Sequence, residues 1–273
     1  MKIGTEREVL ENPRWKCVCA YDGKEFSGWQ SQPDAKTVQG TIEDALAEIF
    51  REPIRIHGTS RTDRGVHARG MVFHFDANWK ATPRKLESAL RRQLPDSIQV
   101  APIERVTADF HARFSATTKQ YRYFIHEGFA DPFTAAYSWS YPRPLDTEAM
   151  KAAAKVLLGK HDFTSFAAYP GYEIETPVRH LQRLDIVRDG PKIIITTEAD
   201  GFLYKMVRSL VGALVAVGSG KYDTDQIRAI LQERKRTSLV VTAPPHGLFL
   251  EKVFYPEAGF QKRKLETADL VSR

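Results

Sequence analysis

The chain has 273 residues, of which 42% are hydrophobic and 27% charged, as is ordinary for a globular protein of one large or two modest domains. No apolar run approaches the roughly 18 residues that a membrane-spanning helix needs, and residues 1–15 lack the apolar stretch of a secretory signal. The two cysteines, Cys17 and Cys19, suit neither a disulfide framework nor a four-ligand zinc site, so we expect a cytoplasmic protein.

The net charge of +6 slightly favours an anionic partner. A broad scatter of basic residues suits a groove that follows a phosphate backbone, although solvated helix faces would produce a similar pattern. The scattered residues are Arg84, Lys85, Arg91, Arg92, Arg113, Lys119, Arg122, Arg143, Arg179, Arg183, Lys205 and Arg208.

In the first half, hydrophobic periodicity predicts four strands and two helices. The second helix has a good start signal, because Thr82 can cap it and Pro83 occupies its first position. The expected strands are 15–21, 54–57, 71–75 and 97–101, and the expected helices are about 38–49 and 82–92.

The second half repeats this order with one extra helix. Asp146 is a suitable cap for the first of its helices. The expected strands are 120–126, 181–187, 192–197 and 248–254, and the expected helices are about 147–157, 202–217 and 224–234.

Each half therefore approximates β-α-β-β-α-β. We expect an α+β fold of two ferredoxin-like halves joined through one extended, mostly antiparallel sheet, with helices on one face and a central basic cleft. The expected units are residues 13–108, residues 109–257 and a tail over 258–273.

The segment TSRTDRGVHAR, residues 59–69, is the most informative part of the chain. It is long for a loop between two strands, and such loops are often functional. It places Asp63 on a turn between Arg61 and Arg64, where positive charge is expected to keep the carboxylate ionised. Such a carboxylate serves as a salt-bridge partner, metal ligand, general base or nucleophile, and an exposed turn with an incidental ion pair is the plainer alternative.

Two further segments carry candidate residues. Tyr121 shares one strand face with Tyr123 and Ile125 and offers a stacking surface for a base, or else a core contact. In the predicted helix around Arg208, glycines would let another backbone approach, and the apolar residues form one face. Arg208 is then either a partly buried cation directed at Asp63 or a surface arginine with its stem packed on the core.

Two apparent motifs predict nothing. Residues 218–221, GSGK, lack the first glycine of a phosphate loop and follow a helix rather than precede one. His57, His67 and His74 are too widely spaced in the sequence for a local ligand pair, so we expect no catalytic metal.

Seven blocks in a fixed order resemble the tRNA pseudouridine synthase I family. The resemblance covers about residues 15 to 254, and the central block departs from the family pattern at Ser60 and Arg64 (usually Gly and Ala), with Met71 after it in place of Gln. The blocks are YDGKEFSGWQSQ (21–32), TVQGTIEDAL (37–46), SRTDRGVHARG (60–70), FHARFSATTKQYRY (110–123), GKHDFTSF (159–166), GFLYKMVRSLVGAL (201–214) and APPHGLFL (243–250).

The resemblance implies an isomerase that converts uridines at positions 38 to 40 of the tRNA anticodon stem-loop to pseudouridine. It implies that Asp63 is the catalytic nucleophile, that Arg61 and Arg208 serve catalysis and substrate binding, and that Tyr121 binds substrate. It also implies a homodimer, and because the reaction adds and removes no group, neither cofactor nor metal. The alternatives are a non-catalytic RNA-binding or RNA-folding protein on the same scaffold and, more distantly, a metal-dependent nuclease.

Overall fold

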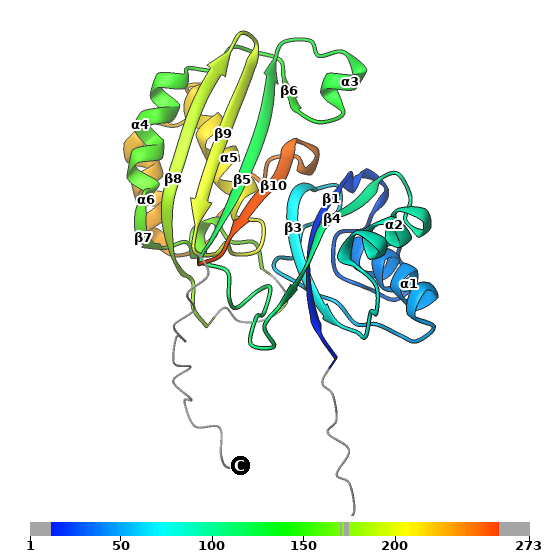
Figure 1. The fold of residues 1–273 in the computed structure, drawn as a ribbon. Coiled ribbons are helices and arrows are strands. Elements are labelled where there is room, and N and C mark those ends of the chain that lie inside the picture. Colours follow the sequence, from blue (N-terminus) through cyan, green and yellow to red (C-terminus); the bar gives the residue numbers. More distant parts are fainter. Residues whose placement is uncertain (1–11, 170, 172–174, 257–273) are drawn as a thin grey trace, which may run out of the picture.

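A single mixed sheet runs through the molecule in the computed structural model, which describes residues 12–169, 171 and 175–256 (Figure 1). The strand order is β4-β1-β3-β10-β5-β9-β8-β7, with β2 beside β3 and β6 beside β5. The described pairings are antiparallel except β3–β10 and β5–β6, so the predicted mixture of helices and strands with a mostly antiparallel sheet is confirmed.

The first half contains the six predicted elements, four strands and two helices, and lies at one end of the sheet (Figure 1). The Thr37 hydroxyl accepts from the Gly40 amide and caps the first helix, while proline opens the second helix as predicted. The strands are β1 (Arg14–Tyr21), β2 (His57–Gly58), β3 (His67–Asp76) and β4 (Ile98–Val106), and the helices are α1 (Val38–Phe50) and α2 (Pro83–Gln93).

The second half supplies the other strands and helices. The Asp146 carboxylate accepts from the amides of Glu148 and Ala149, as expected of a cap. The strands are β5 (Thr118–Glu127), β6 (Trp139–Tyr141), β7 (Gly159–Asp162), β8 (Val178–Asp189), β9 (Lys192–Ala199) and β10 (Leu248–Phe254). The helices are α3 (Pro132–Ala135), α4 (Thr147–Leu157), α5 (Met206–Gly218) and α6 (Thr224–Glu233).

The last strand joins the two halves. β10 pairs antiparallel with β5, and Phe249 and Leu250 also pair in parallel with His67 and Ala68 of β3. A Cβ atom on Gly70 would lie 2.5 Å from the Glu251 carbonyl oxygen, so only glycine allows the two strands to approach this closely.

Three predicted elements differ from the structure. The strand expected at 54–57 is reduced to His57–Gly58, and β3 begins at His67 rather than Met71 because β10 and β1 pair with its first residues. The helix expected from residue 202 begins at Met206, because Lys205 has a left-handed backbone with φ of 57°.

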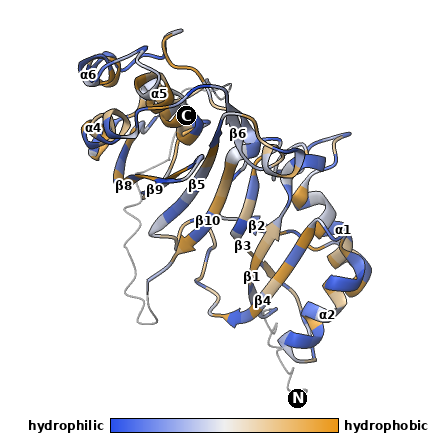
Figure 2. Cartoon of the chain, turned by 90° about the horizontal axis from the view of Figure 1, so that it is seen from above, coloured by the Kyte–Doolittle hydropathy of each residue, from blue (hydrophilic) through white to orange (hydrophobic). Residues whose placement is uncertain are grey.

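Helix α5 is also not amphipathic. All its residues except Arg208 and Ala216 are buried, and its ribbon is largely hydrophobic in Figure 2, whereas that of α2 is largely hydrophilic. A helix that is apolar all round is typical of a core element.

The described chain contains no helix that is long and apolar enough to cross a membrane. Cys17 and Cys19 are buried free thiols in β1. The tail predicted over 258–273 lies outside the described residues.

Candidate active site

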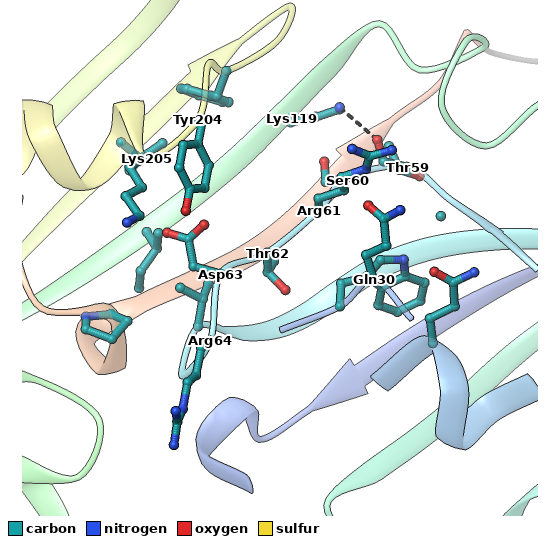
Figure 3. A pocket seen from close by; sticks show the side chains of 18 of the residues that line it. Gln30, Thr59, Ser60, Arg61, Thr62, Asp63, Arg64, Lys119, Tyr204 and Lys205 are labelled. Atoms are coloured by element: carbon teal, nitrogen blue, oxygen red, sulfur yellow. Dashed lines mark hydrogen bonds between the residues drawn. The ribbon is translucent and has the colours of Figure 1, made fainter. Parts of the chain in front are cut away.

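The loop that carries Asp63 spans residues 59–66, because His67–Arg69, which were expected to belong to it, form the start of β3. At its beginning, the Thr59 amide donates to the Val72 carbonyl at 2.9 Å. The Thr59 carbonyl accepts from Lys119 Nζ at 3.0 Å (Figure 3). β3 and β5 therefore both hold this end of the loop.

The middle of the loop packs on the chain that follows β1. The Thr62 hydroxyl and the Tyr21 hydroxyl are hydrogen-bonded at 2.8 Å, and the Trp29 amide donates to the Thr62 carbonyl at 3.1 Å. Thr62 is buried, so the loop turns around an internal anchor rather than projecting freely.

The end of the loop is a tight turn. The Val66 amide donates to the Asp63 carbonyl at 3.1 Å, and Gly65 has a φ of 76°, a conformation that glycine adopts without steric cost. The Gly23 backbone packs so close to Val66 that a Cβ atom there would overlap it, and the Gly23 amide donates to His67 Nδ1 at 3.1 Å. Both ends of the loop are fixed, which limits the positions open to Asp63.

Asp63 forms an ion pair with Arg208, which is far away in the sequence. Asp63 Oδ2 lies 2.7 Å from Arg208 Nη1, and the two side chains are only 17% and 13% exposed. Arg208 Nε donates to the Ala243 carbonyl at 2.7 Å, while the Ala243 amide donates to the Arg208 carbonyl at 3.0 Å. Of the two alternatives for Arg208, the structure therefore shows the partly buried cation directed at Asp63, and a third segment fixes its guanidinium.

The neighbouring arginines do not flank the carboxylate as the sequence suggested. Figure 3 shows Arg64 pointing away from Asp63, while Arg61 lies beside Ser60 and Gln30. Both arginine residues are exposed. Successive side chains on an extended loop point in different directions, so adjacency in the sequence does not create an ion pair.

Tyr121 lies beside the carboxylate on the buried face of β5. Burial raises the pKa of Tyr121 to about 12, with a hydrogen bond from Ser60 opposing the shift and the Asp63 charge adding to it. The Tyr121 ring packs edge-on against Phe202, with centroids 5.2 Å apart. The predicted face shared with Tyr123 and Ile125 is observed, and all three residues are buried.

Asp63, Tyr121 and Arg208 line a cavity of about 1620 Å³. Asp63 is the one acidic side chain among the described residues that line it. The cationic side chains of the lining are Lys24, Arg55, Arg61, Arg64, Arg113, Lys119, Lys205 and Arg208.

Lys119 and Ser60 approach the site but were not singled out by sequence reasoning. Burial lowers the pKa of Lys119 to about 8. Strand alternation could have found this lysine, because it lies two residues before Tyr121 and so shares its face. Ser60 was noted only as a departure from the family pattern.

The histidines are closer together than their sequence spacing suggested. The rings of His57 and His74 are stacked with centroids 5.0 Å apart, because β2 pairs with β3, and His111 lies 4.6 Å from His74. Among the residues that the structure describes, no group of three or more His, Cys, Asp or Glu is placed to hold a metal ion.

Comparison with known proteins identifies the family. A family model described as tRNA pseudouridine synthase matches residues 18–115 and 153–256. A tRNA pseudouridine synthase A of Brevibacillus brevis is 46% identical over 89% of this chain and 99% of its own length. Proteins of the same name from Bradyrhizobium diazoefficiens and Methylacidiphilum infernorum are 43% and 41% identical over 89% of this chain, covering 100% and 95% of their own lengths. With most of the fold matched in this way, the chain belongs to the tRNA pseudouridine synthase family.

Proposed function

We propose that this chain converts uridines at positions 38 to 40 of the tRNA anticodon stem-loop to pseudouridine, with Asp63 as the catalytic nucleophile. Family membership makes the chain an isomerase that acts on tRNA. The observation that supports the catalytic assignment is the half-buried Asp63–Arg208 ion pair beside Tyr121 in the large cavity.

The reaction breaks the N1–C1′ bond of uridine, rotates the uracil and forms a C5–C1′ bond. No atom is gained or lost overall, because the proton released from C5 balances the proton taken up at N1. Asp63 serves this reaction either by attacking C1′ or uracil C6 or by removing a ribose proton. No cofactor or metal is required by this chemistry.

Arg208 orients the carboxylate for its role as nucleophile, because Arg208 Nη1 donates to Asp63 Oδ2 at 2.7 Å. Tyr121 stacks on the uracil and, as a neutral phenol, donates a hydrogen bond during proton transfer. Arg61 is exposed on the same loop, and we assign it to the space that the uridine vacates when it flips out.

The cationic lining of the cavity supports a basic cleft that contacts tRNA phosphates. The strand order is β4-β1-β3-β2 in the first half and β10-β5-β9-β8 in the second. In both halves the last strand lies beside the first, and the third strand lies between the first and the second, which supports two ferredoxin-like halves. Residues 13–108 and 109–257 would be these halves.

The chain is proposed to work in the cytoplasm, where tRNA is modified, as a homodimer in which one tRNA contacts both subunits. Sedimentation of the pure protein tests the dimer: a mass near 62 kDa, twice the 31.0 kDa of one chain, is expected. A single species of 31.0 kDa at micromolar concentration would contradict it.

The decisive experiment compares wild type with Asp63→Asn and Asp63→Ala on an unmodified tRNA transcript. We expect pseudouridine at positions 38 to 40 with wild type, none with either variant, and a tRNA Kd within about tenfold of wild type for both, because binding depends mainly on phosphate contacts. Residual activity above a few per cent would refute the nucleophile assignment. Uncut, unmodified tRNA bound tightly by wild type would instead indicate a non-catalytic RNA-binding protein.

A further inference from the structure

An exposed aromatic ring stands on the wall of the same cavity, in the segment that precedes β5. Phe114 is 76% exposed, and its ring packs on His111 with centroids 4.3 Å apart and an interplanar angle of 35°. Behind it, the His111 ring meets the buried His74, which in turn stacks on His57. The outer ring is thus backed by an aromatic array that reaches into β3.

The turn that presents this ring is locked by hydrogen bonds. His111 Nδ1 lies 3.1 Å from the Arg113 amide and 3.3 Å from the Phe114 amide, both of which donate to it. The Ser115 amide donates to the His111 carbonyl at 2.8 Å, and His74 Nδ1 accepts from the Ala112 amide at 3.2 Å. An ordered turn that leaves a phenylalanine ring in water is prepared to receive a ligand without a large loss of conformational entropy.

Two imidazoles of the array, those of His74 and His111, favour the neutral form. Burial lowers the pKa of His74 to about 4, with the neighbouring His111 adding to the shift. Burial also lowers the pKa of His111, and the neighbouring His57, Arg14 and Arg113 add to the shift. The ring that packs on Phe114 and the ring behind it therefore offer uncharged faces.

A cation lies beside the exposed ring, and others line the cavity that it faces. The Arg113 guanidinium carbon lies 5.7 Å from the Phe114 ring centroid, and Arg55 and Lys119 line the same cavity. A flat aromatic face with a guanidinium group beside it, in a cavity lined by further cations, matches one ligand chemistry, a nucleobase attached to a phosphodiester backbone.

We propose that Phe114, supported by His111 and flanked by Arg113, is a second nucleotide subsite that stacks an unpaired base of the tRNA substrate outside the reacting position. The assignment rests on the proposed function, because it takes RNA as the occupant. The Ala112 carbonyl lies 3.0 Å from the Thr59 hydroxyl, and the four steps along the backbone from Thr59 to Asp63 span at most about 14 Å. The subsite is therefore close enough to hold a nucleotide near the reacting uridine.

The test uses binding in an Asp63→Asn background, so that turnover does not affect the result. Phe114→Ala is expected to raise the Kd of an unmodified tRNA transcript about 10- to 100-fold, and Phe114→Trp to stay within about threefold. Phe133→Ala is the matched control, since Phe133 is 85% exposed and is not among the lining residues of the cavity. A Kd unchanged in Phe114→Ala, or raised equally in Phe133→Ala, overturns the proposal.

A second measurement identifies the stacked base. Anticodon stem-loop RNAs that each carry one abasic nucleotide are titrated against the protein with and without Phe114. At one loop position, removing the base should weaken binding to the protein with Phe114 about tenfold and have little further effect in Phe114→Ala. Equal losses in both proteins at every position would contradict stacking on Phe114. Pseudouridine formation by wild type is scored separately, so failure of the catalytic proposal is distinguishable from failure of the subsite.

Discussion

At the scale of single residues, the site depends on a charge held in place before substrate arrives. Asp63 and Arg208 are mostly removed from water, which costs free energy that their direct hydrogen bond and the Ala243 carbonyl offset. Because Arg208 Nε also donates a hydrogen bond to the Ala243 carbonyl, the guanidinium has little freedom to move when uridine enters. A fixed carboxylate of this kind suits a nucleophile, whose reacting atom must be positioned within a fraction of an ångström.

Replacing Tyr121 by phenylalanine tests whether its hydroxyl takes part in proton transfer. The ring and its contact with Phe202 remain, so we expect the tRNA Kd to be unchanged while kcat falls about 10²- to 10⁴-fold. Burial raises the pKa of Tyr121 to about 12, so its hydroxyl stays protonated up to about pH 10. We therefore expect no fall in kcat from loss of the Tyr121 proton below that pH.

Tyr123→Phe is the control, because Tyr123 lies on the same strand face but donates to the Pro244 carbonyl at 2.8 Å. It should lower stability by about 1 kcal/mol with kcat unchanged. If Tyr121→Phe keeps full kcat, the residue is confined to packing or stacking.

Local patterns left plainer alternatives open for Asp63, Tyr121 and Arg208, and the family resemblance singled the three residues out together; the structure places all three in the lining of one cavity. Sequence reasoning misplaced Arg61 and Arg64 relative to the carboxylate, since chain adjacency says little about where long side chains point. It also overlooked the closeness of His57 and His74, which depends on strand pairing rather than on spacing in the sequence.

At the scale of elements, α5 carries Arg208 and is enclosed on nearly every side. The apolar residues 203, 206, 207, 210, 211 and 214 are buried as the periodicity predicted, but so is most of the opposite face. The segment around Val241–Ala243 covers that face, and its approach requires Gly212, where a Cβ atom would overlap the Val241 carbonyl oxygen. The glycines on this helix indicated that another segment of the chain packs closely against it. Local sequence could not show that this segment is the one around Val241–Ala243.

Gly212→Ala should therefore separate this segment from α5 and disturb the Arg208–Ala243 contacts that lie one turn away. We expect Tm to fall by several degrees, although alanine favours helix by about 1 kcal/mol. Gly218→Ala on the same helix is the control, because its nearest neighbours are side-chain atoms of Met150, 2.8 Å and 2.9 Å away, which can move. Equal Tm values for Gly212→Ala and wild type, measured by thermal unfolding, would contradict the close packing.

At the scale of the whole molecule, the site lies where the two halves join. Asp63 comes from the loop before β3, Tyr121 from β5 and Arg208 from α5, and β10 connects β3 to β5. The similar element order of the halves was predictable from periodicity. The parallel β3–β10 pairing was not, because it joins residues about 180 positions apart and only a folded chain brings them together.

This arrangement predicts how tRNA affinity responds to salt. If the cationic lining neutralises about six phosphates, the affinity should fall roughly a thousandfold between 50 and 200 mM salt. Lys205→Gln removes one cation from the cavity wall and should reduce the slope of log K against log salt by about one, with the greatest loss of affinity at low salt. Lys155→Gln on α4, an exposed lysine that is not among the cavity-lining residues, should leave the slope unchanged. Filter binding of unmodified tRNA over this range measures both, and a flat response would mean that contacts other than phosphate neutralisation hold the RNA.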